Sequence, residues 1–168
     1  MDRQAGVPDG STSYYFRTRD ALVHAVAERV AELDLADLLS VTDVHANTPM
    51  SPQRAASKLA AVVMKSLTGA GLTRTRARIE LLLQASRDPA ISKVFHSNSE
   101  AYLRLHRELA DLTNTADTDA SDIEEQALLT VTFISGLMLG AAAGNQPVVD
   151  GDRLQKLLAQ IGEWRCRS

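Results

Sequence analysis

The side chains that most often carry out chemistry in proteins are few and widely spaced in this sequence. His24 and His45 have no neighbours at metal-ligand spacing, whereas a zinc site requires three or four ligands. His96 and His106 lie ten residues apart, so they point to different faces of one predicted helix. No Gly-x-Ser-x-Gly, His-Glu-x-x-His, Cys-x-x-Cys or phosphate-binding glycine loop occurs. We therefore expect no metal site, no cofactor and no catalytic activity.

The composition indicates an all-α protein. The chain has 168 residues, of which 45% are hydrophobic and 4% aromatic, enough to bury the core of one ordinary domain or of two small ones. Alanine and leucine dominate, and Gly/Pro clusters punctuate the chain at intervals that suit helices. The net charge of −3 argues against a surface devoted entirely to nucleic acid. A single cysteine, Cys166, excludes an internal disulfide and fits a reducing cytoplasm.

A stretch near the amino end has the composition of a surface-binding segment. Gly6 and the Pro8-Asp9-Gly10 cluster favour a turn, after which a short helix is expected to run from about residue 9 or 10 to Phe16. Its hydroxyl side chains and two tyrosines leave one face free to meet another surface. Thr18 then has the character of an N-cap for a longer helix over residues 19–39.

This stretch closely resembles the end of the DNA-binding domain of TetR-family transcriptional regulators. The matching residues are Ala5-Gly6-Val7, Tyr14-Tyr15-Phe16 and Thr18-Arg19-Asp20-Ala21-Leu22, without a gap. The resemblance implies a helix-turn-helix whose second helix enters the major groove of operator DNA. It also implies the residues that contact DNA, with Arg19 and the tyrosine hydroxyls on phosphates: Asp9, Ser11, Ser13, Tyr14, Tyr15 and Arg19.

The family places two further helices before this turn, but only Met1 to Gln4 precede Ala5. We expect either that the native chain is longer or that this is a truncated product, and the sequence leaves both open. Residues 1–40 are then the remnant of a helix-turn-helix domain with its connecting helix, and residues 41–168 a helical ligand-binding and dimerisation domain. The alternative is a truncated dimeric ligand-binding or scaffolding protein without DNA-binding activity.

Five further helices are predicted in this second part. Their expected ranges are residues 51–67, 73–86, 88–111, 121–143 and 152–164. Gly69-Ala70-Gly71 should end the helix of residues 51–67. Asp88-Pro89 should separate the helices of residues 73–86 and 88–111, which are expected to be collinear. Segments 41–52 and 113–121 are expected to be loops. The arginines at positions 74, 76 and 78 are expected to form a solvated or ion-paired face.

The segment from Gln126 to Val149 contains no charged residue and should be the most buried helix of the chain. A membrane span is not expected, because the apolar part, residues 127–143, falls short of about 20 strongly apolar residues. A helix that is apolar on nearly every side must be covered on every side, so we expect a homodimer joined through a four-helix bundle. The expected interface residues are Phe133, Gly136, Leu137, Gly140, Leu154, Leu157, Leu158 and Ile161.

The resemblance further implies a repressor that is released from its operator by a small hydrophobic effector. The pocket should lie among the helices of residues 51–67, 73–111 and 121–143. Candidate lining residues are mostly apolar with a few polar groups, as ligand sites tend to be: Met64, Gln84, Phe95, Tyr102, His106, Phe133 and Met138.

Overall fold

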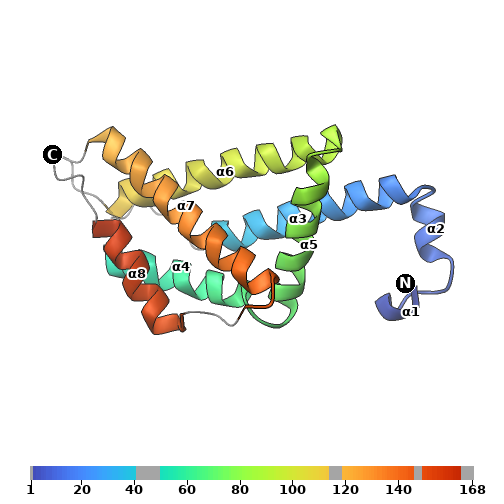
Figure 1. Cartoon of the computed structure of the whole chain (residues 1–168), viewed down its shortest axis with the longest axis horizontal. Coiled ribbons are helices and arrows are strands. Elements are labelled where there is room, and N and C mark those ends of the chain that lie inside the picture. Colours follow the sequence, from blue (N-terminus) through green and yellow to red (C-terminus); the bar gives the residue numbers. More distant parts are fainter. Residues whose placement is uncertain (1, 41–49, 114–118, 146–148, 164–168) are drawn as a thin grey trace.

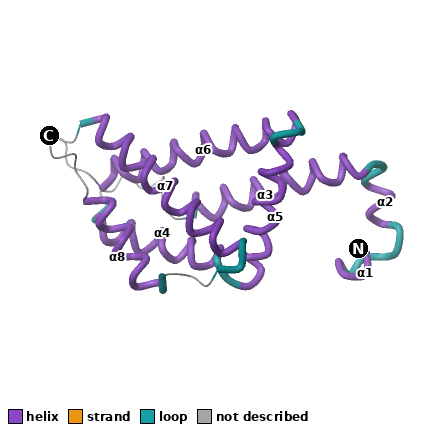
Figure 2. The backbone as a smooth tube through the Cα atoms, in the orientation of Figure 1, coloured by secondary structure: helices purple, strands orange, loops and turns teal. Residues whose placement is uncertain are grey.

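The structure is a computed structural model that describes residues 2–40, 50–113, 119–145 and 149–163. These residues form helices joined by loops, without strands, which confirms the all-α prediction (Figure 2). The helices are α1 (Asp2–Ala5), α2 (Ser11–Tyr15), α3 (Arg19–Leu39), α4 (Pro52–Ser66), α5 (Gly69–Ala85), α6 (Pro89–Thr113), α7 (Ala120–Ala142) and α8 (Gly151–Glu163). The loops predicted over residues 41–52 and 113–121 lie largely outside the described residues.

Helices α3 to α8 pack into one body, and α1 and α2 extend from the amino end of α3, away from that body (Figure 1). Helix α3 is therefore the connection between the two parts. Its start is fixed locally, because the Thr18 hydroxyl accepts a hydrogen bond from the amide of Ala21 at 3.1 Å. Helix α4 begins in the same way, with the Ser51 hydroxyl accepting from the amide of Arg54 at 3.3 Å.

Helix α6 begins at Pro89, as Asp88-Pro89 predicted, but α5 begins earlier than predicted and the two helices are arranged differently. The residues after α4 were predicted to be a break between helices, but Gly69 is the first residue of α5. Its φ of +50° is a backbone conformation that favours glycine. A Cβ atom on Gly71 would clash with the carbonyl oxygen of Lys65, so the glycine allows the two helices to meet at this turn. Helices α5 and α6 are not collinear, since α5 meets the start of α6 at a steep angle in Figure 1.

The start of α7 also differs. Asp119, not Ser121, is the N-cap, and its carboxylate accepts a hydrogen bond from the amide of Ser121 at 3.2 Å. A carboxylate competes well with a hydroxyl for this position. Helix α7 therefore begins at Ala120, one residue before the predicted start.

Two apolar clusters hold the body together. The larger joins α4, α6, α7 and α8 with the end of α3, and Val63 and Leu154 lie at its centre. The smaller joins α3, α5 and α6 around Ile91, which is fully buried. Burial of such side chains contributes roughly 1.5–3 kcal/mol each, so the body rests on contacts among all six helices.

Helix α7 is not the most buried helix of the single chain, contrary to the prediction. Leu128, Leu129 and Leu139 are 55%, 42% and 54% exposed, and a Cβ on Gly136 would meet nothing within 4 Å. The same helix has 23 residues and is long and apolar enough to cross a membrane by length and composition alone. The sequence prediction that this segment is too short to span a membrane therefore does not hold for the whole helix.

Two of the residues expected at a dimer interface are instead part of the chain's own core. Leu154 and Leu158 are 0% and 5% exposed, because the apolar face of α8 packs on α4. The amphipathic pattern of α8 was read correctly, but its partner lies within the same chain. Phe133, Leu137 and Leu157 are half-buried against the same cluster.

Candidate functional site

A cavity of about 180 Å³ lies between α3, α4, α5, α6 and α7. Leu59, Val63, Phe95 and Ile134 are among its apolar walls, and polar groups from α3, α5 and α6 face it as well. Of the lining residues, Leu82, Ser99 and Ser135 are exposed, so the cavity opens to solvent between α5, α6 and α7. A mainly apolar cavity with a few polar groups is the usual form of a small-molecule site.

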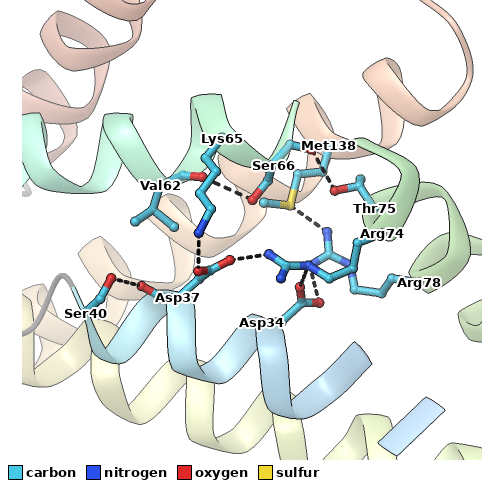
Figure 3. A network of polar contacts seen from close by, with 10 residues as sticks. All are labelled: Asp34, Asp37, Ser40, Val62, Lys65, Ser66, Arg74, Thr75, Arg78 and Met138. Atoms are coloured by element: carbon cyan, nitrogen blue, oxygen red, sulfur yellow. Dashed lines mark hydrogen bonds and ion pairs between the residues drawn. The ribbon is translucent and has the colours of Figure 1, made fainter. Parts of the chain in front are cut away.

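One wall of the cavity is an ion-pair network that joins α3 to α5 (Figure 3). The Asp34 carboxylate lies 2.9 Å from Nε of Arg74 and 3.1 Å from Nη1 of Arg78. Asp37, one turn further along α3, pairs with Arg74 and lies 2.8 Å from Nζ of Lys65. The predicted ion-paired face thus exists for Arg74 and Arg78, whereas Arg76 is exposed.

Burial and pairing act in opposite directions on the two carboxyls. Burial raises the pKa of Asp34, although Arg78 and Arg74 oppose that change. For Asp37, burial also favours the neutral form, but the hydrogen bonds from Lys65 and Arg74 outweigh it and lower the pKa. The network therefore places its most desolvated acid, Asp34, beside two guanidinium groups.

His106 lies at the buried side of the cavity, and one of its ring nitrogens has no hydrogen-bond partner among the described residues. Its Nδ1 lies 2.8 Å from the carbonyl oxygen of Tyr102, and because a carbonyl can only accept, Nδ1 carries the proton. Burial lowers the pKa of His106, so the ring is neutral and Nε2 is an acceptor. Within the described part of the chain, no group hydrogen-bonds to Nε2, although His106 is only 5% exposed.

A second polar atom in the wall has only a weak partner. Nη2 of Arg78 lies 2.6 Å from the sulfur of Met138, and a thioether is a poor acceptor. Tyr102 completes this side of the cavity, with its ring centre 6.4 Å from that of His106. Burial raises the pKa of Tyr102, so its hydroxyl stays protonated.

The structure brings four of the seven predicted lining residues to the cavity: Phe95, Tyr102, His106 and Met138. The other three are not among the lining residues. Gln84 is exposed near the end of α5, Phe133 packs on the larger apolar cluster, and Met64 faces Gly151 of α8. Asp34 was missed by the sequence reasoning, although its position four residues from both Val30 and Leu38 puts it on the buried face of α3.

The amino-terminal segment keeps its predicted DNA-facing residues largely free of the body. Tyr14 and Tyr15 are 79% and 75% exposed, and α2 has no buried residue. Asp9, Ser13 and Arg19 are also exposed, whereas Ser11 is half-buried and donates its hydroxyl to the carbonyl of Pro8 at 2.7 Å. The Asp2 carboxylate accepts from the amide of Gly10 at 2.6 Å, which ties α1 to the start of α2.

Residues 50–163 match a family model described as tetracyclin repressor-like, C-terminal domain. The chain belongs to the TetR family. No curated protein and no solved structure matches it. The matched region of this TetR-family chain begins just before α4 and ends with α8, so it contains every wall of the cavity except the one formed by α3.

Proposed function

We propose that this chain is a ligand-responsive TetR-like transcriptional regulator, normally a repressor, that binds operator DNA as a homodimer and leaves it when a small effector enters the cavity. The observation that carries the proposal is the ion-paired wall: the helix that leads to α2 forms one side of the cavity of a TetR-family regulatory domain. A regulator of this kind acts in the cytoplasm and needs no catalytic site.

The coupling between cavity and DNA would run through α3. Asp34 and Asp37 attach the carboxyl end of α3 to Arg74 and Arg78 of α5 (Figure 3). Helix α2 lies next to the amino end of α3 (Figure 1). A ligand that favours a different arrangement of α3 and α5 lowers operator affinity by its differential binding energy, typically about 1–3 kcal/mol.

The exposed face of α7 supports the homodimer. Leu154 and Leu158 were expected at the dimer interface but are buried within the chain. We assign their place in the interface to the exposed face of α7, which is made of Leu128, Leu129, Gly136 and Leu139. A self-complementary pairing about a two-fold axis would cover it and hold two α2 helices apart by about 34–36 Å, the spacing of successive major grooves. The family match extends over α7, which favours this role over a membrane span.

The alternative function is a dimeric ligand-binding or scaffolding protein that does not bind DNA. It is favoured by α2 itself, which has five residues and none that is buried, so that little of the described chain braces it.

The test compares the 168-residue chain with the chain encoded by any in-frame codons upstream of Met1. Anisotropy of labelled double-stranded DNA from the region flanking the reading frame reports binding. We expect weak or no binding by the 168-residue chain, and salt-sensitive binding by the extended chain that Tyr15→Ala reduces. An extended chain that does not bind any such fragment supports the alternative, and nanomolar binding by the 168-residue chain contradicts the expectation.

A further inference from the structure

One residue that lines the cavity, His106, has a buried hydrogen-bond acceptor. The carbonyl of Tyr102, 2.8 Å from Nδ1 of His106, fixes the ring tautomer and leaves a lone pair on Nε2. That atom is buried without a partner among the described residues. A buried acceptor left without a hydrogen bond is destabilising, and a ligand with a suitable donor removes that cost.

The charges around the cavity leave no obvious place for an ionised ligand. Among the described lining residues the charged side chains are two acids and two bases, and each is already ion-paired: Asp34, Asp37, Arg74 and Arg78. A cation would have to displace a guanidinium from Asp34. An anion would find the charges of Arg74 and Arg78 already balanced by Asp34 and Asp37, and Nη2 of Arg78, now on the sulfur of Met138, is the nitrogen that could donate to it. The remaining wall is mostly apolar. The cavity therefore favours a neutral molecule.

The size of the cavity limits the molecule further. An apolar cavity of about 150 Å³ accommodates a benzene molecule. The volume here, about 180 Å³, suits a single ring with a short substituent that reaches toward the opening at Leu82, Ser99 and Ser135.

We propose that the effector is an uncharged, mainly apolar molecule of about the size of a substituted benzene, and that it donates a hydrogen bond from a hydroxyl or N–H group to Nε2 of His106. This assignment rests on the proposed function, because it names the chemical class of the effector. His106 acts as the specificity-determining residue: its lone pair selects donors, and the balanced ion pairs beside it reject ions.

The experiment uses three probes that share one ring and one ethyl group: para-ethylphenol, para-ethyltoluene and para-ethylbenzoate. Titration calorimetry with the 168-residue chain measures each dissociation constant. We expect the phenol to bind about tenfold more tightly than the toluene, which cannot donate; this corresponds to about 1.4 kcal/mol, within the range for one hydrogen bond. The benzoate should bind weakest, because Asp34 and Asp37 already balance the charges of Arg74 and Arg78 and would repel its carboxylate.

Two variants assign the preference to one atom. His106→Phe keeps an aromatic ring but removes the acceptor, so the preference for the phenol over the toluene should disappear. His96→Phe, a histidine exposed on the same helix, should leave all three constants unchanged. Heteronuclear NMR of the ring nitrogens should show the Nε2 signal of His106 shifting with the phenol and not with the toluene, a change that a purely structural residue would not give.

Equal binding of phenol and toluene overturns the inference and indicates that Nε2 is satisfied by water. A preference that survives in His106→Phe overturns it as well, and so does tightest binding by the benzoate. If none of the three probes binds, the size and chemistry assigned to the effector are wrong. The proposed function itself fails only in the DNA-binding experiment described above, so the two failures are distinguishable.

Discussion

His106 shows how one backbone contact can define the chemistry of a buried side chain. The carbonyl of Tyr102, one helical turn earlier, holds the proton on Nδ1, and burial keeps the ring neutral. A neutral ring inside a folded protein is linked to pH, because the unfolded chain takes up a proton more readily than the folded one. His106, the residue proposed to bind the ligand, therefore also makes the free energy of unfolding depend on pH.

We predict that the free energy of unfolding falls as the pH decreases through about 6.5, the ordinary histidine pKa. Below that value the unfolded state binds the proton, whereas folded His106, with its lowered pKa, does not until the pH is lower still. Thermal melts between about pH 8 and about pH 5 should show a smaller drop for His106→Phe than for the wild type. His96→Phe serves as the exposed control, and identical drops in all three proteins would contradict the prediction.

Asp34 is the second residue with a measurable role, because two partly buried guanidinium groups pair with it. It is 7% exposed and pairs with both Arg74 and Arg78. Removing one partner of a buried ion pair leaves the other charge uncompensated, so Asp34→Asn should cost about 3 kcal/mol in urea denaturation. Glu32→Gln, which breaks the exposed pair with Arg29, should cost less than about 1 kcal/mol. Equal losses of unfolding free energy in the two variants would show that the ion pairs of Asp34 behave like exposed ones.

At the scale of the elements, the turn between α4 and α5 is defined by the absence of a side chain. Gly69 adopts a positive φ, and the missing Cβ of Gly71 leaves room for the carbonyl of Lys65. Since that carbonyl belongs to the helix backbone, it cannot move aside without disturbing α4. The start of α5, and hence the position of Arg74 and Arg78, depends on this contact.

We expect Gly71→Ala to destabilise the protein by about 1–3 kcal/mol, the usual cost of overpacking. Gly162→Ala is the matched control, because its added Cβ would be in ordinary contact at 3.8 Å from Gln126 and 3.9 Å from Pro52. In a helix this change should be neutral or stabilising by roughly 0.5–1 kcal/mol. Denaturant melts distinguish the two. A neutral Gly71→Ala would mean that α5 can shift freely at its start.

The elements also show what could be predicted from the sequence. Helix α3 was predicted with its observed bounds because Thr18 caps it locally. The start of α5 at Gly69 and its steep angle to α6 could not be predicted, because both depend on packing against other parts of the chain. The cavity shows the same division: Phe95 and Met138 follow helical spacing, whereas Asp34 acquires its role from Arg78, 44 residues later. The location of the pocket was thus partly predictable and its polar wall was not.

For the whole molecule, the distribution of exposed leucines is uneven. Leu128, Leu129 and Leu139 share one helix, α7, and flank a glycine whose surroundings are open. Leu83 is more exposed, at 68%, but lies on α5. The proposed dimer therefore makes a specific demand: the α7 leucines should matter for assembly, and Leu83 should not.

Sedimentation velocity tests this demand. Leu139→Glu should raise the dimer dissociation constant at least roughly a hundredfold, because a two-fold dimer loses about 1.5–3 kcal/mol of apolar burial at each of two copies. Leu83→Glu should leave the constant unchanged. A folded wild-type monomer at micromolar concentration, or equal effects of the two variants, would rule out this interface.

The Asp88 carboxylate links two helices at once. It accepts the amide of Ala90 at 2.9 Å, which starts α6, and it lies 2.8 Å from Nε2 of His24 near the beginning of α3. The far end of α3 is fastened by Asp34 to α5. Because α3 is held at both ends, it cannot tilt as a rigid body and keep both sets of contacts. Any tilt of α3 must break the contact of His24 with Asp88 at the first turn of α6 or the ion pairs of Asp34 with Arg74 and Arg78.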